Sequence, residues 1–205
     1  MSSTITTPMS SPATALPRKP AAQVALSARC TSSSGIWVGL FAITMSFAAF
    51  TSALVVRAGT ADWSHLVLPP ILYINTLCLL TSSAMVEVSR RALLGSGGVR
   101  RAGTWIGISL LLGLAFCFGQ YRAWLDLRAQ GLYLATNPNS SFFYVLTFMH
   151  ALHVLAGLFA LAFLTYRLGT RGKAVRRTIF QNTAIYWHFM AALWVYLFLL
   201  CRAEL

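Results

Sequence analysis

Three histidines lie inside the last two long apolar stretches of the chain: His150 and His153 in the fourth and His188 in the fifth. None of the apolar stretches holds an Asp or Glu in its middle. An ionisable side chain in hydrocarbon needs a partner inside the protein and is a functional candidate by default. The missing carboxylates argue against a proton relay or a cation site made by this chain alone.

The spacing of the histidines places them on two helices at comparable depths. His150 and His153 are three residues apart and project from the same side of one helix. At about 1.5 Å of rise per residue, His153 and His188 lie at similar depth. Tyr186 and Thr147 are near them in sequence and offer hydroxyl groups. The last two spans are therefore expected to meet at these side chains.

Three kinds of chemistry fit such histidines. They could form a cluster of neutral, hydrogen-bonded side chains that locks the two spans together. They could ligate a metal or a haem, because neutral imidazole is a common metal ligand, although no Cys, Asp or Glu lies near them at a usable depth. They could sense pH or pass protons, which would require further titrating groups along a path.

The apolar stretches themselves predict an all-α, multi-pass membrane protein. The chain has 205 residues, of which 57% are hydrophobic and 10% charged, a balance that excludes an ordinary soluble domain. Each stretch is close to the roughly 20 residues that cross a bilayer, the third once Gln120, Tyr121 and Trp124 complete it. The five predicted spans are Ile36–Val56, Leu66–Val86, Gly103–Phe118, Phe142–Tyr166 and Ala184–Cys201.

The basic residues predict an orientation. Segments on one side of the five spans carry twelve of the 16 Lys and Arg: Arg18, Lys19, Arg29, Arg90, Arg91, Arg100, Arg101, Arg167, Arg171, Lys173, Arg176 and Arg177. The other side carries four: Arg57, Arg122, Arg128 and Arg202. Cytoplasmic loops are richer in Lys and Arg, so the N-terminus is expected in the cytoplasm and the C-terminus on the periplasmic side. The same distribution favours anionic lipid headgroups as partners and argues against nucleic acid.

The connections and the N-terminus are also predicted from composition. Residues 1–34 are rich in Ser, Thr, Ala and Pro and are expected to form a disordered cytoplasmic tail, followed by a membrane domain over residues 35–205. Pro69 and Pro70 are expected in the first turn of the second span. A flexible turn is expected from Arg90 to Arg101, a long outer loop from Tyr121 to Ser141, and a basic turn of about a dozen residues before the fifth span.

Polar and small residues inside the spans indicate where helices meet. Asn75 with Thr76 and Ser82 with Ser83 are side chains of the kind that join helices across a bilayer. Gly107 and Gly113 would permit close approach of the third span. The four cysteines include no C-x-x-C pair, so neither a disulfide framework nor a metal knuckle is expected.

The last two spans resemble subunit III of the haem-copper oxidases, the cytochrome c oxidase group. Residues 143–157 read FYVLTFMHALHVLAG, similar to the family pattern F-x-x-x-T-G-x-H-G-L-H-V-x-x-G. Residues 186–194 read YWHFMAALW, similar to Y-W-H-F-V-D-x-x-W. Pro70 with Asn75 and Thr76, and Gln120 with Trp124, resemble the family's signatures in the second and third spans.

This resemblance implies the short, five-helix bacterial form of the subunit. It implies a non-redox accessory chain in the bacterial inner membrane, which supports the stability and proton supply of the catalytic subunit in aerobic electron transport. The chain itself would hold no haem, copper or catalytic centre, while partner subunits, catalytic subunit I above all, would hold haem and copper. Bound phospholipid is implied as well. The interhelical cluster would comprise Asn75, Gln120, Thr147, His150, His153, Tyr186 and His188.

Several family residues are absent. Ala123 and Ala191 stand where the family has carboxylates, and the carboxylate expected near Ala42 is missing too, so a proton-antenna role is not carried over. Phe148 and Ala151 replace two glycines. Three alternatives stay open: a subunit of a quinol oxidase or the related accessory protein of nitric oxide reductase, a haem- or metal-binding membrane protein, and a small transporter. The electron donor is selected by other chains.

Overall fold

The computed structural model describes residues 21–59, 69–94, 98–131, 138–171 and 177–204. Within these ranges the chain consists of helices and short turns, without strands. The helices are α1 (Ala21–Ala58), α2 (Ile71–Leu94), α3 (Gly98–Ala129), α4 (Pro138–Arg171) and α5 (Arg177–Glu204). In the described parts, all five are long and apolar enough to cross a membrane. The predicted fold class is confirmed.

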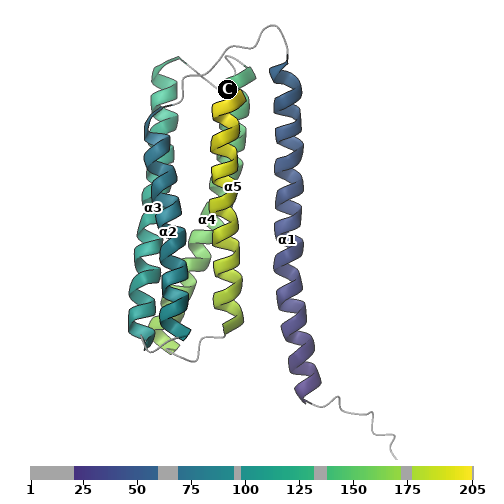
Figure 1. Ribbon diagram of the computed structural model, residues 1–205, viewed down its shortest axis with the longest axis vertical. Helices are drawn as coiled ribbons and strands as arrows, with labels where there is room; N and C mark the ends of the chain where they lie inside the picture. Colours follow the sequence, from purple (N-terminus) through teal and green to yellow (C-terminus); the bar gives the residue numbers. More distant parts are fainter. Residues whose placement is uncertain (1–20, 60–68, 95–97, 132–137, 172–176, 205) are drawn as a thin grey trace, which may run out of the picture.

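The helices α2 to α5 form an antiparallel bundle, and α1 stands beside it (Figure 1). The most extensive contact is between α2 and α3, and within the described residues α1 touches only α4 and α5. A continuous apolar core runs through the bundle, with Phe116, Leu161, Trp187 and Trp194 among its largest buried side chains. These contacts bring α2, α3, α4 and α5 together around one interior.

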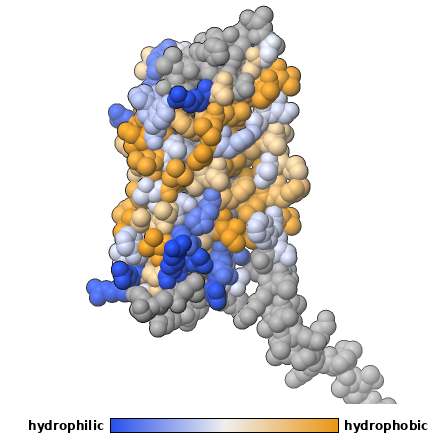
Figure 2. All heavy atoms as spheres, viewed as in Figure 1, coloured by the Kyte–Doolittle hydropathy of each residue, from blue (hydrophilic) through white to orange (hydrophobic). Residues whose placement is uncertain are grey.

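The surface carries the pattern of a membrane protein. Many large apolar side chains are exposed around the middle of the helices, among them Phe41, Leu111 and Phe159. In Figure 2 apolar residues cover the middle of the visible face, and hydrophilic ones gather mainly at the end where α2 finishes and α3 begins. An apolar belt of this kind suits lipid or a partner subunit rather than water.

The helices extend beyond the predicted apolar stretches. Residues 121–129, expected as part of an outer loop, continue α3. Ala123 and Leu127 prolong its buried stripe, while Arg122, Asp126 and Arg128 are exposed. Arg90 and Arg91 belong to α2 and pair with Glu87, and only residues 95–97 separate α2 from α3. The expected loop over 121–141 and the expected turn over 90–101 are therefore both too long.

The remaining differences concern helix starts. Pro69 and Pro70 precede α2 in a turn, in which Leu72 N donates to Pro69 O and Tyr73 N to Pro70 O, each at 3.1 Å. The helix α1 begins at Ala21, inside the segment expected to be a disordered tail, and residues 1–20 lie outside the described part. The helix α5 begins at Arg177, before the predicted Ala184, so only residues 172–176 remain between α4 and α5.

Candidate functional site: a polar interior in the helix bundle

The residues of the predicted cluster come from four helices. Asn75 lies on α2, Gln120 on α3, Thr147, His150 and His153 on α4, and Tyr186 and His188 on α5. Asn75, Gln120, Thr147 and His150 are buried, and the other three are partly buried. All seven lie on helix faces that point into the bundle, but they do not all face one another.

His150 is fully buried among aromatic rings. Its centroid lies 5.2 Å from the ring of Trp194 on α5 and 6.1 Å from Phe116 on α3. Neither ring nitrogen has a hydrogen-bond partner among the described residues. The ring contacts of His150 thus join α4 to α3 and α5. Its two nitrogen atoms form no hydrogen bond with the residues that the structure describes.

His153 connects α4 to two helices. Its Nδ1 lies 2.7 Å from Met149 O, one turn earlier on α4. Tyr186 on α5 donates its hydroxyl proton to the backbone oxygen of His153 at 2.9 Å, and Phe47 on α1 packs edge-on against the imidazole at 5.8 Å. The meeting of α4 and α5 at this level therefore involves the His153 backbone and the Tyr186 hydroxyl.

His188 faces α2. Its Nδ1 lies 2.5 Å from Ser83 Oγ. Tyr186 and His188 are two residues apart on one helix, so they point to different sides, and only Tyr186 faces α4. Within the described residues, no hydrogen bond joins two imidazoles. The sequence predicted a hydrogen-bonded cluster of imidazoles and nearby hydroxyl groups. The structure places a hydroxyl at His188 but shows no bond between imidazoles.

A reciprocal polar link between helices joins Ser82, which the sequence indicated, to Ser109, which it did not single out. Ser82 Oγ donates to Ser109 O at 2.8 Å, and Ser109 Oγ donates to Ser82 O at 3.0 Å. Trp187 Nε1 on α5 donates to Ser82 Oγ at 3.1 Å. All three residues are buried, so this network fixes α2, α3 and α5 at one point. The available signal for Ser109 was a lone serine within an apolar run.

Two further indoles make the same kind of link. Trp194 Nε1 donates to Thr76 Oγ1 at 3.0 Å, which joins α5 to α2. Trp124 Nε1 donates to Thr147 Oγ1 at 3.1 Å, which joins α3 to α4. Thr147 in turn donates to Phe143 O at 2.7 Å. In each case the indole N–H donates to a hydroxyl on the neighbouring helix.

Small residues allow these helices to approach. A Cβ placed on Gly113 would lie 2.9 Å from Trp187 Cη2, and one on Gly157 would lie 2.9 Å from Trp187 Cε3. A Cβ on Gly119 would collide with the Asn75 side chain. At Gly107, by contrast, nothing lies within 4 Å, so the close approach expected there is absent.

The arrangement offers hydrogen bonds rather than a ligand set. Among the residues that the structure describes, no three His, Cys, Asp or Glu side chains gather into a group able to hold a metal ion. Ala123 and Ala191 are buried within the apolar core. What these groups can do chemically is donate and accept hydrogen bonds between helices.

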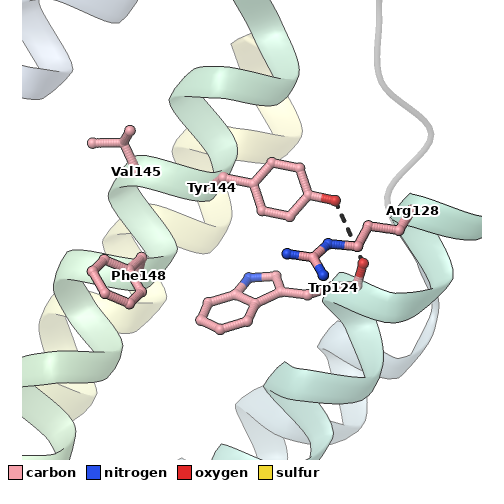
Figure 3. A pocket seen from close by; sticks show the side chains of 5 residues that line it. All are labelled: Trp124, Arg128, Tyr144, Val145 and Phe148. Atoms are coloured by element: carbon pink, nitrogen blue, oxygen red, sulfur yellow. Dashed lines mark hydrogen bonds between the residues drawn. The ribbon is translucent and has the colours of Figure 1, made fainter. Parts of the chain in front are cut away.

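A pocket of about 320 Å³ opens between α3 and α4 (Figure 3). Trp124 and Arg128 line it from α3, and Tyr144, Val145 and Phe148 from α4. The Tyr144 hydroxyl donates to Trp124 O at 3.4 Å. One guanidinium beside aromatic and aliphatic side chains suits an amphipathic anion.

Comparison with known proteins agrees with this geometry. The family model for cytochrome c oxidase subunit III matches residues 35–202, which include all five predicted spans. A cytochrome c oxidase subunit 3 of Synechocystis is 30% identical over 82% of this chain and 69% of its own length. The cytochrome bo(3) ubiquinol oxidase subunit 3 of Pseudomonas aeruginosa is 30% identical over 80% of each. The cytochrome c oxidase subunit 3 of Thermostichus vulcanus is 31% identical over 81% of this chain and 84% of its own.

Proposed function

We propose that this chain, which belongs to the cytochrome c oxidase subunit III family, acts as a non-redox accessory subunit that supports the stability and proton supply of the catalytic subunit in a respiratory terminal oxidase. The observation that carries the proposal is the match over residues 35–202, which spans the whole bundle. The buried contacts of the bundle support it, because they join helices by hydrogen bonds.

The partners follow from the same premise. We infer that the chain packs against the catalytic haem-copper subunit I and other oxidase subunits, and that haem and copper belong to those chains. The exposed apolar side chains supply the surface for such packing, since a transmembrane helix buries apolar faces against lipid or other helices alike.

We propose the bacterial inner membrane as the location, with the N-terminus cytoplasmic. Successive helices alternate in direction, so Arg90, Arg100, Arg167 and Arg177 share one end of the molecule. Arg57, Arg122, Arg128 and Arg202 lie toward the other. The richer end faces the cytoplasm by the positive-inside rule.

Phospholipid is the ligand that we propose for the surface pockets. The pocket at Arg128 places a cation beside aromatic side chains near the outer end of α3. A second, apolar groove of about 540 Å³ lies between α1 and α5, lined by Trp37, Val38, Leu40, Phe41, Thr44 and Phe189. The first suits an anionic headgroup and the second suits acyl chains.

The accessory role has a direct test. His153→Leu and His188→Leu variants of the native complex should assemble less stably but start turnover at close to the wild-type rate. Polar contacts between membrane helices average about 0.6 kcal/mol and reach about 1.7 kcal/mol, too little to stop chemistry in another chain. Initial oxygen consumption by an intact complex is the measurement. Immediate loss of all activity in a complex that still contains the subunit would rule out a structural role.

Copurification identifies the complex. A tag on this chain should isolate a haem-copper catalytic subunit, whereas a stoichiometric Soret band from the chain alone would contradict the proposal. The resemblance to a bo(3) ubiquinol oxidase subunit favours quinol as the second candidate for the electron donor. Oxidation of cytochrome c against oxidation of quinol by the isolated complex decides between the two.

A further inference from the structure

Five polar atoms in the interior of the bundle have no hydrogen-bond partner among the described residues. They are Asn75 Nδ2, both polar side-chain atoms of Gln120, and both ring nitrogens of His150. Asn75 is 3% exposed, Gln120 1% and His150 0%, so bulk solvent does not reach them. Buried groups of this kind are almost always paired with protein or with ordered water.

The contacts between helices place these three residues at one level. The Asn75 side chain fills the space that Gly119 leaves open, and Gly119 is the residue directly before Gln120. Trp124 bonds to Thr147, and Gly113 packs against Leu158. Because α3 and α4 are antiparallel, Gln120 lies opposite the part of α4 that holds His150.

The contacts of Trp194 on α5 are independent evidence that these three residues lie at one level. Its ring lies 5.2 Å from that of His150, and its Nε1 donates to Thr76, the neighbour of Asn75. Phe116, one turn before Gln120, contacts both the His150 and the Trp194 rings, at 6.1 and 4.9 Å. The unpaired atoms therefore belong to one polar layer, enclosed by aromatic rings.

The chemistry of the layer selects its ligand. Gln120 and Asn75 present amide donors, Gln120 also presents a carbonyl acceptor, and a neutral imidazole presents one donor and one acceptor. A ligand that both donates and accepts fits this set, whereas an ion has no opposite charge to meet: among the described residues no carboxylate lies within the layer.

We propose that Asn75, Gln120 and His150 form a buried binding site for water, in which a small cluster of molecules connects α2, α3 and α4. The site goes beyond the accessory role, because it concerns the interior of the bundle and not its partners. The water molecules would be the hydrogen-bond partners of these side chains, and they would fix the positions of α2, α3 and α4 relative to one another along the bundle axis.

A high-resolution electron cryomicroscopy map of the native complex tests the site. Solvent density should lie within hydrogen-bond distance of His150 and Gln120. A direct hydrogen bond between the Gln120 amide and the His150 ring would overturn the proposal, and so would a layer without solvent density. This measurement uses the wild-type protein and does not depend on the folding of any variant.

A substitution with a matched control adds a second readout. Gln120→Leu should remove the solvent density and shift the unfolding equilibrium of the subunit about threefold to eighteenfold toward the unfolded state, the range of single polar contacts in membranes. Gln130→Leu, at an exposed position directly after the same helix, should change neither. Solvent density that persists unchanged in the Gln120→Leu variant would contradict a role for the Gln120 amide as ligand.

Discussion

At the scale of single residues, Ser82 makes more interhelical hydrogen bonds than any histidine of the motif. It exchanges hydrogen bonds with Ser109 and receives the Trp187 indole proton. Removing one partner leaves the others buried without a bond, which costs more than the bond itself contributes. The histidine motif marks the region, while the serine hydroxyls and the tryptophan indole hold it together.

Ser82→Ala should therefore destabilise the bundle by about 1–2 kcal/mol, toward the upper end of what polar contacts contribute in membranes. Thermal or denaturant unfolding of the purified subunit or complex in detergent measures the change. Ser46→Ala is the control, because Ser46 is exposed and bonds to Ala42 O on its own helix. Equal stability of the two variants would show that the Ser82 network contributes nothing.

Arg128 supports a second prediction at this scale. If its guanidinium holds an anionic headgroup, Arg128→Gln should release one anionic phospholipid per subunit, counted by native mass spectrometry after delipidation in mild detergent. Arg122→Gln, exposed on the same helix but outside the pocket lining, should retain it. The same lipid count in both variants, or loss of a zwitterionic lipid instead, would contradict the assignment of the pocket.

At the scale of elements, the geometry of each helix contact depends on which glycines meet a neighbour. Gly157 on α4 lies under the Trp187 ring, whereas Gly107 on α3 faces open space. Both lie within helices, so replacing either by Ala should stabilise its helix by about 1 kcal/mol through helix propensity alone. The sign of the total effect then depends on packing alone.

Gly157→Ala should destabilise the α4–α5 contact by about 1–3 kcal/mol, because the rigid, fully buried Trp187 ring must shift. Gly107→Ala should be neutral or stabilising by up to about 1 kcal/mol. Unfolding midpoints of the two variants, measured side by side in the same detergent, give the comparison. A Gly157→Ala variant as stable as Gly107→Ala would mean that α4 and α5 adjust without cost.

The sequence predicts the helices better than their ends or their rotation. Apolar runs located all five spans, because a bilayer demands about 20 apolar residues in each. The predicted third span ended before residues 121–129, although α3 includes them. A helix continues through charged residues at the interface as long as one of its faces stays buried. The motif located His188, but its partner Ser83 depends on how α5 is rotated, which no pattern within one span reports.

At the scale of the whole molecule, the direction in which the bundle crosses the membrane rests on charge. The two ends differ in basic residues, and moving such loops across the bilayer is disfavoured. Figure 1 places the end of α5 opposite the start of α1, as an odd number of crossings requires. The two ends of the bundle should therefore be reachable from different compartments.

Single cysteines test this arrangement. In a background with the four native cysteines replaced by Ala, Ala203→Cys at the end of α5 should react with a membrane-impermeant maleimide added to intact spheroplasts. Thr170→Cys, exposed near the end of α4, should react only after the membrane is permeabilised. Both sites are exposed, so a difference in labelling reports the side of the membrane and not burial. The reverse pattern would contradict the proposed orientation. It would place the Arg128 pocket in the cytoplasmic leaflet, whose anionic lipids would then be the ones that reach it.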